Sequence, residues 1–253
     1  MPRAQLYDQI GGTYTATRRT EPRIAEQVWA ALGDAGTVLN VGAGTGSYEP
    51  ADRDVTAVEP SVVMRAQRAG DAARCAAAAA EALPFADRSF DAAMAFATVH
   101  HWPDPVAGLR EMQRVARRVV VFTCETTDFD WRQRFWLTRD YLPEVVASPV
   151  GLATRLARAV DARVERVLVP WDCADGFFEA YWRRPEAYLS PEVRGAISSL
   201  AGGGMAAALT RLADDLATGA WARKHGHVRA LDELDLGYRL IVARPGAADD
   251  APS

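Results

Sequence analysis

The chain has 253 residues, of which 25% are charged, with a formal net charge of −4 and a pI near 5.6. This length suits one large core, and the acidic balance argues against a protein that gains its affinity mainly from phosphates, so we expect no nucleic-acid partner. The sequence contains no apolar run near the roughly 20 residues of a membrane span and no signal-peptide core at its beginning, so we expect a cytoplasmic location and no membrane contact.

Helix and strand alternate in the first part of the chain. Apolar residues at every fourth position predict a helix over 20–33. Apolar runs on either side of a glycine-rich turn predict strands over 37–41 and 54–58, and a helix is expected after Pro60. The five alanines of 76–80 favour a helix by intrinsic propensity.

The middle of the chain continues this alternation and then loses it. A strand is predicted over 90–96, and a helix over 104–117 begins at a Pro-Asp-Pro turn. The continuous apolar run over 119–123 is typical of a strand that is buried on both faces. Residues 126–160 carry no clear strand, and helical periodicity returns within them.

Two further strands, over 164–169 and 236–243, complete the pattern, with helices expected between them. Strands that alternate with helices imply a parallel sheet that is covered on both faces. Ligands of such sheets bind at the carboxyl ends of the strands, where the strand order reverses. We therefore expect a binding site at that edge of the sheet.

The most informative segment is the glycine-rich turn Gly42-Ala43-Gly44-Thr45-Gly46, with Glu59 at the end of the following strand. Glycine lets the backbone turn sharply and lets a ligand approach without a Cβ in the way. A carboxylate can accept two hydrogen bonds from a vicinal diol, so the turn and the carboxylate together predict a nucleoside site. The dinucleotide pattern GxGxxG would require glycine at position 47, where this chain has serine.

Three further motifs follow in order: Glu81-Ala82-Leu83-Pro84-Phe85 with Ser89-Phe90-Asp91, then Val99-His100-His101-Trp102, then Leu109-Arg110-Glu111-Met112-Gln113-Arg114-Val115. Together with the GxGxG turn, they resemble the class I S-adenosylmethionine (SAM)-dependent methyltransferases. Within that class, the similarity is to the small-molecule branch that includes the quinone-biosynthesis (type 11) enzymes. The resemblance covers residues 37–123.

The resemblance implies an α/β fold with a doubly wound, mostly parallel, seven-stranded Rossmann-like sheet and a helical lid inserted after strand five. It also places a short third strand within 76–80, against the alanine propensity, and we adopt that strand. The expected parts are a SAM-binding part with an N-terminal cofactor-covering arm over 1–125 and a helical lid over 126–163. The remaining strands with substrate-side helices of the same domain follow over 164–244, and a tail over 245–253.

The implied cofactor is SAM, with S-adenosylhomocysteine (SAH) as its product and no metal. In similar enzymes the glycines wrap the amino-acid part of SAM and leave backbone N–H groups for its carboxylate, and the acidic residue holds the ribose. Most relatives also have an aspartate where this chain has Ala79, so Glu81, a backbone carbonyl or water must meet the adenine amine instead. The residues expected to bind the cofactor are Tyr14, Arg18, Gly42, Ala43, Gly44, Gly46, Glu59, Pro60, Ser61, Met64, Ala80, Glu81, Ala97 and His100.

His100 and His101 are the candidate catalytic residues, because they follow the fourth strand at the expected mouth of the site. A histidine could remove a proton from a hydroxyl, a phenol or an acidic carbon. The alternative is that the pair only shapes the loop. Cys124 stands where RNA cytosine methyltransferases carry a nucleophile, but their Pro-Cys pair is missing here, so we expect a buried small residue.

Half of the aromatic residues (7 Trp, 7 Tyr and 8 Phe in total) lie within 129–188. They indicate either an apolar pocket beneath the lid or packing of the lid on the sheet. We predict a SAM-dependent methyltransferase that acts on a small apolar or aromatic metabolite. Two alternatives stay open: a catalytically inactive SAM-binding partner or sensor protein, suggested by Ala79, and an NAD(P)-dependent oxidoreductase, which Ser47 disfavours.

Overall fold

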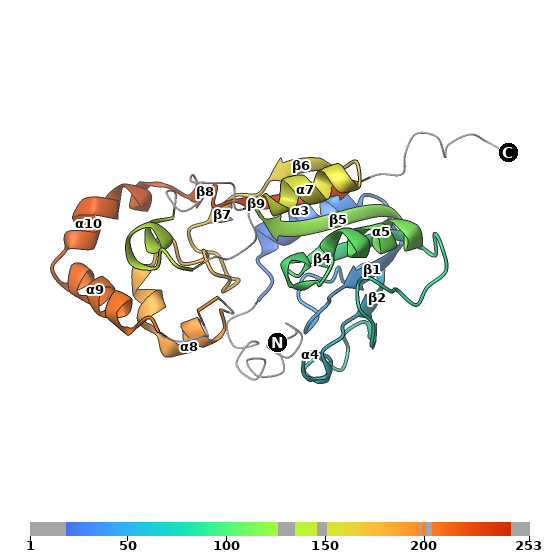
Figure 1. Ribbon diagram of the computed structural model, residues 1–253, viewed down its shortest axis with the longest axis horizontal. Coiled ribbons are helices and arrows are strands. Elements are labelled where there is room, and N and C mark those ends of the chain that lie inside the picture. The colour runs from blue at the N-terminus through green and yellow to red at the C-terminus, as the bar shows by residue number, and fades with distance from the viewer. Residues whose placement is uncertain (1–18, 126–134, 146–150, 198, 201–203, 244–253) are drawn as a thin grey trace.

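Seven strands form one sheet in the computed structural model, which describes residues 19–125, 135–145, 151–197, 199–200 and 204–243 (Figure 1). In spatial order they are β3 Arg74–Ala76, β2 Asp54–Val58, β1 Thr37–Val41, β4 Phe90–Phe96, β5 Ala116–Cys124, β9 Tyr238–Ala243 and β6 Arg163–Arg166. β9 pairs antiparallel with both of its neighbours, and the other pairings are parallel. The predicted doubly wound, mostly parallel α/β fold is confirmed.

The central strands are buried on both faces because successive side chains enter two different cores. On one face, Val38 and Met94 pack with helix α3 (Pro22–Leu32). On the other face, Leu39 packs with α5 (Pro105–Val115) and α7 (Leu152–Ala159). Continuous apolar runs such as Val119–Phe122 are therefore the expected pattern for these strands.

The two long helices beside the sheet begin at polar caps that the sequence specifies. Asp104 accepts hydrogen bonds from the amides of Val106 and Ala107 (3.1 and 3.0 Å) and thereby caps α5. Glu21 does the same for α3 through the amide of Arg23 (3.2 Å). A proline follows each cap, where its missing N–H costs nothing.

Beyond one end of the sheet the chain forms a helical lobe, a name we use for residues 135–145 and 169–236 as far as they are described (Figure 1). Its elements are η3 Leu137–Tyr141 (a π-helix), β7 Val169–Pro170, η4 Pro185–Leu189, α8 Pro191–Gly195, α9 Ala206–Ala217, α10 Ala220–His225, η5 Gly226–Ala230 and β8 Glu233–Leu234. Its buried aromatics, including Phe135, Trp182 and Trp221, share one core with α3 and the sheet. Within the described ranges, none of the helices has the length and apolar character needed to cross a membrane.

Predicted boundaries are wrong in three elements of the first half. The third strand spans Arg74–Ala76 instead of lying within 76–80, because β2 ends at Val58, opposite Ala76, and offers no partner beyond it. The helix predicted over 104–117 ends at Val115. The next residue is already extended (φ −133°, ψ 151°), so β5 begins at Ala116, before the predicted position 119.

The strand predicted over 164–169 is divided between two sheets. Arg163–Arg166 forms β6 on the edge of the main sheet, whereas Val169 pairs with Leu234 in a separate two-stranded sheet. The last strand begins at Tyr238 and not at 236. The predicted division into a SAM-binding part, a lid and a substrate-side part stays a prediction. Part of the predicted lid range lies outside the described residues, and α7, from the same range, packs on the sheet beside α5.

Candidate active site

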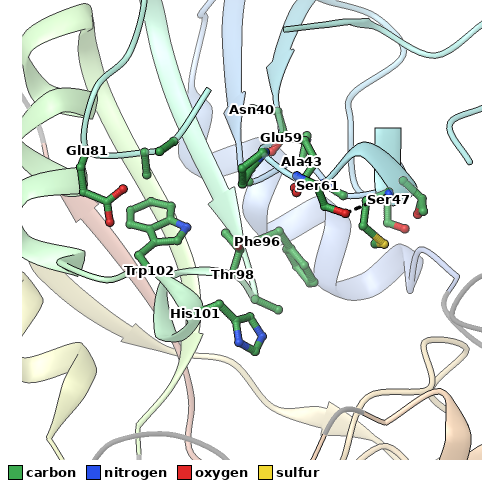
Figure 2. Close-up of a pocket in the computed structure, with 18 of the residues that line it drawn as sticks. Asn40, Ala43, Ser47, Glu59, Ser61, Glu81, Phe96, Thr98, His101 and Trp102 are labelled. Carbon is green, nitrogen blue, oxygen red and sulfur yellow. Dashed lines mark hydrogen bonds between the residues drawn. The ribbon is translucent and has the colours of Figure 1, made fainter. Parts of the chain in front are cut away.

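A cavity of about 250 Å³ lies at the carboxyl ends of β1, β2 and β4 (Figure 2). The strand order reverses between β1 and β4, so the cavity occupies the place where ligands of such sheets bind. The residues that line it are Asn40, Gly42, Ala43, Gly44, Thr45, Ser47, Glu59, Pro60, Ser61, Met64, Ala79, Ala80, Glu81, Phe96, Ala97, Thr98, His101, Trp102 and Pro103.

The glycine-rich turn forms one wall of the cavity, and its conformation explains why glycine is required. Gly42, Gly44 and Gly46 have positive φ values of 69°, 52° and 98°, a region that other residues rarely adopt. A Cβ on Gly42 would lie 2.4 Å from Oγ1 of Thr98, at the end of the neighbouring strand. Glycine at 42 therefore allows the turn to approach β4 closely.

Four amides of the turn are already engaged, so the expectation that the turn leaves N–H groups for a ligand carboxylate does not hold for these four. The amides of Gly42 and Ala43 both donate to the carbonyl oxygen of Val58 (2.9 and 3.0 Å). The amide of Gly46 donates to Ala43 (2.9 Å), and that of Gly44 donates to Glu59 (2.9 Å). The turn is thus fixed by internal hydrogen bonds, and a ligand meets a wall that is already formed.

Glu59 is the buried carboxylate of the cavity, with 8% of its surface exposed. Oε2 accepts the hydrogen bond from the amide of Gly44, and Oε1 accepts one from the amide of Ser61 (2.8 Å). Burial raises the pKa of this carboxyl, while the hydrogen bonds from Ser61 and Gly44 act in the opposite direction. Because each carboxylate oxygen has two lone pairs, one acceptor position per oxygen is left for a diol.

The opposite wall comes from the end of β4 and the turn that follows it. Ala97 lines the cavity with φ +50°, an unfavourable conformation for a residue other than glycine. Its amide donates to the carbonyl oxygen of Phe122 on β5 (2.9 Å), which holds the backbone in place. Backbone strain of this kind is typical of functional sites.

Trp102 and Glu81 lie beside each other at another part of the wall (Figure 2). The indole of Trp102 rests on α5, where a Cβ on Gly108 would lie 2.5 Å from the ring. Oε1 of Glu81 accepts a hydrogen bond from the amide of Asp104 (3.1 Å), the residue that caps α5. The start of α5 is therefore fixed to the cavity wall.

The two histidines occupy different positions relative to the cavity. Both belong to the short helix η2 (Val99–His101), and their rings lie 3.8 Å apart between centroids. His101 lines the cavity, whereas His100 is not among the lining residues. Cys124 is buried, and burial raises the pKa of its thiol well above the ordinary value, which argues against a thiolate nucleophile.

Most of the predicted site residues meet at the cavity. Those that line it are Gly42, Ala43, Gly44, Glu59, Pro60, Ser61, Met64, Ala80, Glu81, Ala97 and His101. Gly46 and His100 do not line it, and Tyr14 and Arg18 lie outside the described residues. Within the part of the chain that the structure describes, no cluster of His, Cys, Asp or Glu has the arrangement of a metal site.

Sequence reasoning missed several lining residues, namely Asn40, Thr45, Phe96, Thr98, Trp102 and Pro103. Asn40 carried a usable signal, because it is a polar residue within an otherwise apolar strand. Thr98 and Phe96 did not, because their place at the cavity depends on the pairing of β1 with β4.

The residues present fit the nucleoside part of SAM, since a buried carboxylate with two remaining acceptor positions lies beside a glycine turn, where side chains would otherwise fill the space.

A methyltransferase domain model matches residues 39–123, which include this turn. The chain is 33% identical to a protein from Anabaena variabilis ATCC 29413 that is described as an inferred methyltransferase from an antibiotic biosynthesis pathway. That similarity covers 90% of this chain and 98% of the other, with a TM-score of 0.74.

Two other relatives are more distant. A tRNA (carboxymethyluridine(34)-5-O)-methyltransferase from Xenopus tropicalis is 29% identical over 123 residues, which are 45% of this chain and 19% of that protein's length. The [4+2]-cyclase SpnF shares the fold, with 20% identity, coverage of 88% of this chain and 80% of the other, and a TM-score of 0.51. The chain belongs to the class I SAM-dependent methyltransferases, and its cofactor is S-adenosylmethionine.

Proposed function

We propose that this methyltransferase acts on a small apolar or aromatic molecule. The observation that carries the proposal is an aromatic stack that begins at the cavity wall. Phe96 lines the cavity and stacks on Tyr48 (3.5 Å between centroids) and on Phe122 (4.3 Å). Phe122 stacks in turn on Tyr238 (5.1 Å). An apolar or aromatic acceptor suits such a wall, because pockets for small molecules are lined mainly by apolar and aromatic groups.

The similarity to the Anabaena protein supports a small-molecule acceptor, because that protein is described as part of an antibiotic biosynthesis pathway. The similarity extends over 90% of this chain, so it includes most of the helical lobe. The Xenopus relative suggests a second candidate, a tRNA acceptor, but it matches only 45% of the chain. The net charge of −4 also argues against a large phosphate-binding surface. The expected cytoplasmic location is part of the proposal.

SAM, when bound, supplies a methyl group that its sulfonium has already activated. The residues of this chain then have to align the acceptor and exclude water. We assign the ribose to Glu59 and keep Tyr14 and Arg18 as candidates for the carboxylate of the amino-acid part. His101 faces the cavity, where it can position an acceptor. It can also remove a proton if the acceptor is a hydroxyl, a phenol or an acidic carbon.

The test offers the purified protein SAM with a labelled methyl group, together with either a metabolite extract or total tRNA. We expect label in the small-molecule fraction and none in the tRNA. Label in the tRNA would overturn the proposed acceptor class. Tight SAH binding in calorimetry without label in either fraction would favour the non-catalytic binding protein. The Glu59→Ala variant serves as a low-labelling control, because it should bind the cofactor more weakly than the wild type.

A further inference from the structure

A buried ion pair lies directly behind the glycine-rich turn. Nη2 of Arg68 is 2.8 and 2.9 Å from the two carboxylate oxygens of Glu49. The side chains of Arg68 and Glu49 are only 5% and 10% exposed, and neither residue lines the cavity. A buried pair of this kind gains little stability over apolar residues of similar size, because both charges lose their hydration. The role of the ion pair is therefore inferred from its contacts and not from a contribution to stability.

The guanidinium of Arg68 reaches the turn itself. Its Nη1 donates to the carbonyl oxygen of Gly44 (3.4 Å), and its Nη2 also donates to that of Ala73 (3.0 Å). The amide of Gly44 is held from the other side by Glu59 (2.9 Å). Gly44, whose backbone lines the cavity, is thus held at both its N–H and its C=O group.

Glu49 connects the pair to a second lining residue, Asn40. Nδ2 of Asn40 donates to Oε1 of Glu49 (3.0 Å), and Asn40 is only 1% exposed. Because one N–H of the amide is committed to Glu49, Asn40 can offer a ligand its carbonyl oxygen and its second N–H. Rotating the amide would bring two acceptor oxygens together, so the carboxylate fixes the orientation.

Gly46 lies against this ion pair, although it does not line the cavity. A Cβ at this position would lie 3.2 Å from Nη1 of Arg68 and 3.3 Å from Oε2 of Glu49, in a backbone conformation with φ +98°. Glycine at 46 thus leaves room for the ion pair against the turn. This is a different role from the direct cofactor contact that the sequence suggested.

We propose that Arg68 and Glu49 are positioning residues for the cofactor, acting through Gly44 and Asn40. The pair holds the turn and the Asn40 amide in their binding arrangement before the cofactor arrives. Affinity for the cofactor then depends on two residues that do not touch it. The inference rests on SAM as cofactor and is independent of the acceptor class.

The decisive variant is Glu49→Met/Arg68→Met, which replaces the pair with apolar side chains. Replacing a buried ion pair in this way often leaves stability unchanged. We expect a melting temperature close to that of the wild type and a Kd for SAH, measured by calorimetry, that rises about tenfold, because two hydrogen bonds to lining residues are lost. Hydrogen exchange at Gly44 without cofactor should become faster. Wild-type affinity in the folded double variant would overturn the proposal.

Arg68→Lys provides a second test if the double variant does not fold. The ammonium keeps the charge opposite Glu49, but it cannot reproduce the planar set of donors to Glu49, Ala73 and Gly44. We expect a severalfold rise in the Kd for SAH, and unchanged affinity would again overturn the proposal. The control is Asp235→Met/Arg239→Met, which removes a 2.8 Å ion pair outside the cavity lining. That variant should bind SAH as the wild type does.

Discussion

His225 should make the stability of the helical lobe depend on pH. The imidazole is 1% exposed at the end of α10, with Nε2 3.0 Å from Asp140 and Nδ1 3.2 Å from the guanidinium of Arg139. Burial lowers the pKa of His225 from 6.5 to about 4. Arg139, Lys224 and His227 act in the same direction, whereas Asp140 favours the charged form. Because the guanidinium can only donate, its contact with Nδ1 also requires a neutral ring.

The sign of this pH dependence follows from the linkage between protonation and folding. The folded pKa lies below the unfolded one, so the unfolded chain takes up the extra proton first, and stability is lost as the pH falls from 6.5 towards 4. At pH 5, about 1.5 units below the unfolded value, the loss from this one group reaches about 2 kcal/mol. Urea unfolding at pH 7.5 and pH 5 measures it, with His225→Gln as the test variant.

The loss of about 2 kcal/mol between the two pH values should disappear in His225→Gln, because the variant has no group to protonate at that position. The matched control is His227→Gln, which changes a histidine two residues away and should retain most of the wild-type pH dependence, because His227 has the smallest of the named effects on His225. The same pH dependence in wild type and His225→Gln would refute the assignment of the neutral, buried imidazole.

The remaining predictions concern the cavity. Glu59→Ala should weaken SAH binding by about 1–3 kcal/mol in calorimetry, because the ribose loses a charged acceptor. Burial raises the pKa of Glu59, so the affinity of the wild type for SAH should also fall on acidification. This pH dependence should flatten in Glu59→Gln. Gly42→Ala should reduce SAH affinity and lower the melting temperature, since its Cβ would meet Thr98 at 2.4 Å. His101→Ala should reduce turnover and cofactor affinity together, with His100→Ala less affected; a turnover loss of about 10²–10⁴-fold at unchanged affinity would instead identify a base.

Three strands, β1, β2 and β4, have the predicted bounds. β1 and β2 end at local signals, the glycine turn and Glu59. The errors occurred where an end depends on a partner strand. β3 stops at Ala76 because β2 stops opposite it, and the alanines that follow give no sign of this. Similarly, Val169 leaves the main sheet for Leu234, which lies far along the chain.

The same distinction applies to the site. Glu59 and the glycine turn could be read from the sequence because one strand-turn-strand segment contains all of them. Arg68 could not, since its relation to Gly44 depends on how the chain folds back after α4 (Val62–Ala66). The sequence also does not show that the amide of Gly44 already donates to Glu59, so that a ligand meets a turn that is fixed by internal hydrogen bonds.

Among the described residues, the polar contacts that we propose for the cofactor lie at the end of the cavity where Glu59 and the turn are. At the other end, Ala79 offers only a methyl group, and one oxygen of Glu81 is engaged with the amide of Asp104. Moving Glu81 towards a ligand would therefore release the residue that caps α5. Within the part of the chain that the structure describes, contacts there are left mainly to apolar groups and the backbone, which discriminate less than a buried carboxylate. In the proposed assignment, the selectivity of the site therefore depends on Glu59 and on the turn beside it, the part that the buried ion pair contacts.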